Sequence, residues 1–200
     1  MADRIARAMV VTAHPDDSEF GAGGTVAKLV KDGCEVTYVV VTNGNKGSSD
    51  RSMTPERLAA IRADEQRNAA RTLGVARVEL LGYPDGEVED TRDLRRDVSR
   101  QIRKWRPDLL ICQNPNRTYN LGPEFEPHKV KHVYVMQWQN PQLVVDITDV
   151  IDVKLRALAC HASQFSDVAA LQERVRQRAA ELGKAKDYAY AECFDHIVMG

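Results

Sequence analysis

Alternating strand-like and helix-like segments restrict this chain to one class of fold. Residues 6–12 and 35–42 are apolar runs rich in β-branched residues, as expected of strands that are buried on both faces. Residues 23–31 between them can form a helix, and Gly33 marks its end. Strands joined in this way by helices form a parallel sheet with helices on both faces. We therefore predict an α/β fold with a mainly parallel sheet.

The following segments continue the alternation. Thr54, Pro55 and Glu56 predict a helix start with a capping threonine, a first-turn proline and an early carboxylate, and this helix runs to Gly74. Further strands are predicted at 78–81, 108–112, 132–136 and 143–147, and further helices at 92–105, from Thr148 or Asp149 to about His161, and at 168–182. The length and the lack of an internal repeat or linker indicate a single domain over residues 1–200.

Charge and composition exclude several classes of partner. With 28 basic and 29 acidic side chains, the net charge of −1 provides no overall field to hold nucleic acid or an anionic membrane. The apolar run at 8–13 is too short for a signal peptide, and no run approaches a membrane span. The four cysteines are far apart and show no metal-binding or disulfide spacing, so we expect reduced thiols in a cytoplasmic protein.

The strongest chemical signal is the AHPDD turn directly after the first strand. In a parallel α/β sheet, ligands bind at the carboxyl ends of the strands, where this turn lies. His14 and Asp17 can ligate a metal through nitrogen and oxygen, while Asp16 can take a proton from metal-bound water. An isolated His-x-x-Asp is more often a polar turn with a capping aspartate. The full pattern of strand, AHPDD and glycine-rich helix start favours the metal site.

A nucleotide-binding interpretation of the same glycines fits less well. The dinucleotide fingerprint requires GxGxxG, and the last position here is Val26. The second strand ends in Thr42, Asn43 and Gly44, without an acidic residue for a ribose hydroxyl.

Beyond the AHPDD turn, several motifs resemble those of the LmbE-like, or PIG-L, zinc-dependent de-N-acetylases. They follow the family's order along most of the chain: GAGGT at 21–25, TNG at 42–44 with KG at 46–47, Arg62 and Glu65 in PERLAAIRADE, LGYPDG at 81–86, RPD at 106–108 and HASQ at 161–164. The resemblance implies a Rossmann-like fold. It also implies hydrolysis, assisted by zinc (Zn²⁺), of an N-acetyl group on a small amino-sugar or related conjugate.

The resemblance also implies roles for individual residues. His14 and Asp17 match metal ligands, and Asp16 matches the general base. Three further residues match positions that line or support the substrate pocket, namely Arg62, Asp85 and Asn43. An ordinary structural role remains open for these three: a solvated or salt-bridged arginine and two turn residues.

One departure from the family pattern concerns the third metal ligand. The family takes this ligand from an HxDH motif after the fourth strand, and the chain has no HxDH. Only His128 and His132 lie nearby. The valines around His132 favour a strand, in which the two side chains would be too far apart to share an ion easily.

The same stretch also lacks a crossover helix. Residues 113–131 contain three prolines and no helical periodicity, whereas a parallel connection needs a dozen or more residues, usually helical. Either the strand at 132–136 is antiparallel or a segment is missing. The third metal ligand and the crossover helix are both absent from this stretch. We therefore predict that a segment is lacking between about 116 and 127. It is either deleted from the gene or, being disordered without metal, omitted from the sequence as printed.

These observations leave two functions open. The first is a de-N-acetylase acting on a small N-acetylated molecule, without nucleic acid or membrane as partner. The alternative is a catalytically impaired binding protein of the same fold, in which the metal site is incomplete. The chain could form a homo-oligomer, and the sequence does not identify the acetylated substrate.

Overall fold

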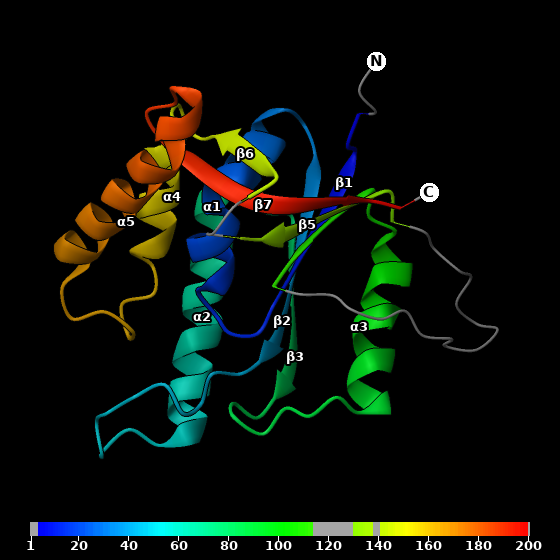
Figure 1. Cartoon of the computed structure of the whole chain (residues 1–200). Helices are drawn as coiled ribbons and strands as arrows, with labels where there is room; N and C mark the ends of the chain where they lie inside the picture. The colour runs from blue at the N-terminus through cyan, green and yellow to red at the C-terminus, as the bar shows by residue number, and fades with distance from the viewer. Residues whose placement is uncertain (1–3, 114–129, 138–140, 200) are drawn as a thin grey trace.

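The computed structural model describes residues 4–113, 130–137 and 141–199 and contains one seven-stranded sheet flanked by helices (Figure 1). The strands are β1 (Arg7–Thr12), β2 (Glu35–Thr42), β3 (Arg77–Tyr83), β4 (Leu109–Cys112), β5 (His132–Met136), β6 (Leu143–Asp146) and β7 (Ala191–Val198). The helices are α1 (Asp17–Lys31), α2 (Pro55–Leu73), α3 (Arg92–Trp105), α4 (Ile151–Leu158) and α5 (Val168–Gly183), followed by the short 3₁₀ helix η1 (Lys184–Lys186).

The sheet is mostly parallel. Its strands lie in the order β3-β2-β1-β4-β5-β7-β6, and the neighbours from β3 to β5 are paired in parallel. Only β7 runs against both of its neighbours, β5 and β6. The carboxyl ends of β1, β2, β3 and β4 therefore meet at one edge of the sheet. This arrangement confirms the predicted α/β class.

Helices cover both faces of the sheet, as predicted. Helices α1, α2, α4 and α5 lie on one face in Figure 1, and α3 lies on the other. The larger core includes Tyr38 and Phe194 of the strands, packed with apolar residues of α1, α2 and α4. The smaller core includes Met9 and Val39, against which Ile102 and Trp105 of α3 pack. Both faces of β1 and β2 are thus buried, which explains their near-continuous apolar sequence.

Helix α1 begins at Asp17, six residues earlier than the predicted start at residue 23. The glycines in this stretch belong to the helix, and they allow it to pack closely against its neighbours. A Cβ at Gly21 would collide with the sulfur of Met136, and one at Gly24 would lie 2.7 Å from Cγ2 of Ile147. Asp17 and Glu19 also stabilise the first turn through the helix dipole.

The close approach at Gly24 gives a testable stability prediction. Gly24→Ala should destabilise the fold by about 1–3 kcal/mol, because the added methyl group must displace the β-branched Ile147 in a packed core. Urea unfolding would measure the change. The matched control is Gly23→Ala on the same helix, where the nearest atom is Cγ of Lys154 at 3.3 Å and a shift of a few tenths of an ångström makes room for the methyl group. Equal stability of the two variants would contradict the packing argument.

The structure differs from the sequence predictions at two strands, β5 and β7. The strand at 132–136 pairs in parallel with β4, so the antiparallel alternative was wrong. The structure also contains β7, which was not predicted, because Glu192, Asp195 and His196 obscure its apolar pattern. The segment predicted to be lacking between about 116 and 127 lies outside the described residues, so that prediction stays untested.

A buried ion pair joins β7 to the helices. Lys154 of α4 donates to Oε1 of Glu192 at 2.7 Å and to the carbonyl of Phe20 at 2.8 Å. The Glu192 carboxylate also accepts from the backbone amides of Gly24 and Thr25, at 2.8 and 2.7 Å, and from the Thr25 hydroxyl. The side chains of Lys154 and Glu192 are only 4% and 3% exposed. This pair therefore fixes α1, and with it the turn that precedes α1, against β7.

Candidate active site

The turn between β1 and α1 brings His14 and Asp17 together. Nδ1 of His14 lies 3.4 Å from Oδ2 of Asp17, and the His14 backbone amide donates to the same oxygen at 2.8 Å. A zinc ion bound tetrahedrally at 2.0–2.2 Å would hold such a nitrogen and oxygen about 3.3–3.5 Å apart. The structure thus places the two predicted donors at a separation that suits one ion, and their role as ligands stays a prediction.

Asp85 contacts the other ring nitrogen of His14, the one that does not face Asp17. Its Oδ1 is 2.8 Å from Nε2 of His14, and its backbone amide donates to Oδ1 of Asn45 at 3.0 Å. With the proton on Nε2, His14 donates to Asp85 and directs the lone pair of Nδ1 towards Asp17. Two acceptor atoms then face each other, which favours a cation between them. Metal-binding histidines commonly have such a carboxylate partner on the other ring nitrogen.

The remaining ligands of a zinc site are not evident. In the described ranges, no group of three or more His, Cys, Asp or Glu side chains could hold a metal. His132 begins β5 opposite Leu109, at the amino ends of the strands and so at the far edge of the sheet from His14. There its Nδ1 is 3.1 Å from Nε2 of His196. His128 lies outside the described residues.

Asp16 has an unusual backbone and a buried carboxyl group. It occupies the N-cap position of α1 with φ 99°, a left-handed conformation that residues with a Cβ rarely adopt. Its Oδ2 lies 3.4 Å from Nη2 of Arg62. Burial raises the pKa of Asp16 to about 6, although the nearby Arg62 guanidinium opposes that rise. A carboxylate with a raised pKa suits proton transfer near neutral pH.

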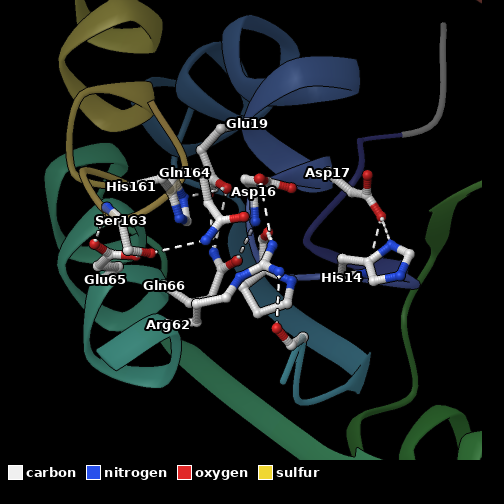
Figure 2. A network of polar contacts seen from close by, with 12 residues as sticks. His14, Asp16, Asp17, Glu19, Arg62, Glu65, Gln66, His161, Ser163 and Gln164 are labelled. Atoms are coloured by element: carbon white, nitrogen blue, oxygen red, sulfur yellow. Dashed lines mark hydrogen bonds and ion pairs between the residues drawn. The ribbon is translucent and has the colours of Figure 1, made fainter. Parts of the chain in front are cut away.

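Arg62 lies beneath the turn, where its side chain is only 5% exposed (Figure 2). Its guanidinium donates to the carbonyls of Pro15 at 2.7 Å and Gly44 at 3.1 Å. These bonds connect the turn after β1 to the turn after β2. Arg62 is therefore not a solvated arginine, whereas the salt-bridged arginine of the structural alternative agrees with its ion pair to Asp16. The contacts shown are to the protein's own backbone and to Asp16.

Asn43 acts within its own turn. Its Oδ1 accepts from the Asn45 amide at 3.2 Å, and its backbone amide donates to the carbonyl of Tyr83. Asn45 in turn holds the backbone of Asp85. Asn43 thus supports the site through Asn45 and Asp85.

Sequence reasoning missed Gln66 and Glu19, two members of a buried polar network beside Asp16, and identified the third, His161, only as part of the HASQ motif. Gln66, Glu19 and His161 have no exposed surface, and they connect α2, α1 and the segment after α4. Nε2 of Gln66 and Nε2 of His161 both lie 3.1 Å from the Glu19 carboxylate. One feature of the sequence could have revealed this network. Gln66 follows Arg62 by four residues, on the same helix face as Ala69 and Leu73, where polar residues need partners.

Comparison with known proteins adds independent findings. The family model PIG-L, described as GlcNAc-PI de-N-acetylase, matches residues 9–139. Diacetylchitobiose deacetylase from Thermococcus kodakarensis is 31% identical over 218 residues, covering 94% of this chain and 82% of the relative. A probable N-acetyl-alpha-D-glucosaminyl L-malate deacetylase 2 from Bacillus anthracis is 27% identical, with 79% of this chain and 81% of the relative covered.

A solved structure of a deacetylase is also similar to this chain. N,N'-diacetylchitobiose deacetylase from Pyrococcus horikoshii, in complex with its inhibitor MPG, superposes with a TM-score of 0.87 at 29% identity. The match covers 97% of this chain and 84% of that one. The 218 aligned residues of the Thermococcus relative exceed the 200 residues of the chain, so the relative has residues without a counterpart here.

Proposed function

The chain belongs to the PIG-L family, and from that premise we propose that it is a zinc-dependent hydrolase that removes an N-acetyl group from a small amino-sugar conjugate. The relatives are named as deacetylases of N-acetylglucosamine-containing compounds. The observation that carries the proposal is the position of His14 between the carboxylates of Asp17 and Asp85, with a third carboxylate, Asp16, in the same turn.

In the proposed mechanism, His14 and Asp17 contribute two of the metal's ligands. When bound, zinc supplies Lewis-acid polarisation of the amide carbonyl and lowers the pKa of water. Asp16 accepts a proton from the attacking water, whose oxygen bonds to the acetyl carbon. The same carboxyl group then delivers that proton to the amide nitrogen as the C–N bond breaks, which releases acetate and the free amine. Asp85 keeps the His14 ring oriented throughout.

Metal analysis of the purified protein, combined with an amine-release assay, tests this proposal. Suitable substrates are N,N'-diacetylchitobiose, N-acetylglucosamine and N-acetylglucosaminyl L-malate. We expect bound zinc, release of acetate and amine in equal amounts, and loss of turnover on chelation that added zinc restores. Tight sugar binding without turnover at any zinc concentration would contradict the proposal and favour the binding-protein alternative.

We also propose that residues lacking between about 116 and 127 complete the metal site. The longer aligned stretch in the Thermococcus relative supports this proposal. Sequencing the coding region would test it, since an additional segment with metal-ligating side chains is expected there. If the gene encodes the chain as printed, the deletion is real and zinc should bind weakly, because catalytic zinc sites usually have three protein ligands.

Asp85 offers a test of the carboxylate–histidine arrangement. Asp85→Asn should weaken zinc binding by about 10- to 100-fold, because Asn cannot provide the negative charge that fixes and polarises the His14 ring. Competition with a chelator of known affinity would measure the change. Glu87→Gln is the control, since Glu87 is an exposed neighbour paired with Lys46. Unchanged zinc affinity in Asp85→Asn would mean that Asp85 does not act through the metal.

The proposed partner is the small N-acetylated substrate alone. None of the helices that the structure describes has the length and apolarity to cross a membrane. The four cysteines are free, which supports the proposed cytoplasmic location, where thiols remain reduced. Gel filtration with light scattering would test for the homo-oligomer.

A further inference from the structure

We propose that Gln66 is a positioning residue that holds Asp16 in its left-handed conformation and so aims the Asp16 carboxyl group at the reaction centre. This inference rests on the proposed function, because it takes Asp16 to be the general base. Gln66 itself lies on α2 and has no exposed surface through which it could contact a substrate. Its effect would be exerted entirely through the backbone of Asp16.

The conformation of Asp16 requires external support. Its φ of 99° lies in a region that side chains with a Cβ populate sparsely, and such residues persist only where their surroundings fix them. Asp16 also precedes α1 without a capping hydrogen bond from its own side chain. The carboxyl group is thereby kept out of the usual capping role.

Hydrogen bonds fix the Asp16 backbone on both sides. Its amide donates to Oε1 of Gln66 at 3.0 Å. Its carbonyl accepts from the amides of Glu19 and Phe20 in the first turn of α1, at 3.0 and 3.1 Å. The preceding carbonyl, that of Pro15, accepts from Arg62. Gln66 and Arg62, both on α2, hold the two ends of the planar peptide unit that joins Pro15 to Asp16, and Gln66 is the residue that accepts from its N–H.

The neighbours of Gln66 determine which way its amide points. Nε2 donates to both oxygens of Glu19, at 3.1 and 3.3 Å. A flipped amide would direct its oxygen at the Glu19 carboxylate and its NH₂ at the Asp16 N–H, which would set like partners against each other. His161 donates to Oε2 of Glu19 and completes the set, as Figure 2 shows. The buried Glu19 and His161 therefore direct the Gln66 acceptor at Asp16.

This arrangement matters for catalysis because the side-chain direction of Asp16 depends on its φ. A general base must lie within hydrogen-bond reach of the proton that it takes, and small misplacements reduce the rate strongly. A rigid acceptor on a helix supports the base better than a loop would. Loss of that acceptor should reduce the chemical step without reducing substrate affinity.

Gln66→Met tests the inference, because methionine keeps the length and volume of glutamine and removes its hydrogen bonds to Asp16 and to Glu19. With N,N'-diacetylchitobiose, we expect kcat to fall about 10- to 100-fold while KM and zinc content stay within about twofold of wild type. The Asp16 amide should exchange with deuterium faster, and its ¹³Cα and ¹³Cβ shifts should move away from values typical of positive φ.

Glu65→Gln is the matched control. Glu65 is the neighbouring buried residue on α2, and its carboxylate accepts from the amide and hydroxyl of Ser163 at 2.6 Å each. Its substitution should lower the melting temperature and leave kcat and Asp16 exchange unchanged. A purely structural role for Gln66 predicts that both variants lose stability and neither loses kcat. That result would overturn the inference.

Two further provisions keep the test decisive. If Gln66→Met does not fold, Gln66→Asn takes its place, since its shorter amide cannot reach both Asp16 and Glu19. If wild type shows no deacetylase activity, the proposed function fails, and the exchange and chemical-shift measurements still decide whether Gln66 holds Asp16. A protected Asp16 amide with unchanged shifts in the variant would contradict the positioning role independently of any activity.

Discussion

Asp16→Asn should lower turnover by about 10²- to 10⁴-fold while the protein stays folded and keeps its zinc. Asparagine tolerates positive φ better than most residues, so the backbone at this position should survive the change. Its amide cannot accept the proton of the attacking water, whereas the buried Asp16 carboxyl can. Single-turnover kinetics on a responsive N-acetylated substrate, combined with zinc analysis, would measure the loss.

Asp64→Asn is the control for that experiment. Asp64 is an exposed aspartate on α2, paired with Arg67, and it has no role in the proposed chemistry. It should turn over at the wild-type rate. If Asp16→Asn also turned over normally, another group would have to serve as base.

Lys154→Met should destabilise the fold by about 3–5 kcal/mol. The substitution leaves the Glu192 carboxylate buried without its counter-charge, although the amides of Gly24 and Thr25 still donate to it. Urea denaturation at constant pH would measure the free energy of unfolding. A loss below about 1 kcal/mol would show that the backbone donors alone compensate the charge.

Two variants establish the origin of that loss. Lys31→Met breaks a pair of similar length, 2.6 Å to Asp149, whose side chains are 64% and 49% exposed, and it should cost at most about 1 kcal/mol. Adding Glu192→Gln to Lys154→Met should recover part of the stability, because no uncompensated buried charge then remains. No recovery in the double variant would indicate lost packing in place of lost charge compensation.

Much of the fold followed from local sequence signals. The capping threonine and first-turn proline of α2 predicted its start at Pro55, and Gly74 ends it with φ 76°. Buried parallel strands such as β2 are continuously apolar and therefore easy to recognise. The start of α1 and the strand β7 were missed for one reason. Their glycines and charged residues have partners distant in sequence, such as Ile147 and Lys154, which no local pattern reveals.

The site was predictable to a similar extent. The spacing of His14 and Asp17 in a strand-to-helix turn predicted their proximity, which the structure reproduces. The burial of Arg62 and the link from Gln66 to Asp16 depend on how α2 packs against that turn. Such tertiary contacts decide whether a polar residue on a helix is solvated, and a single sequence contains no record of them.

The position of β7 has a consequence for biosynthesis. This strand is the last of the described elements to leave the ribosome, yet it lies inside the sheet, between β5 and β6. Until Glu192 has been synthesised, Lys154 and the middle of α1 lack their buried partner. Contacts between residues so far apart in sequence also form slowly. We therefore expect the nascent chain to remain open on the α1 side, with the AHPDD turn acquiring its final shape only after translation has passed this strand.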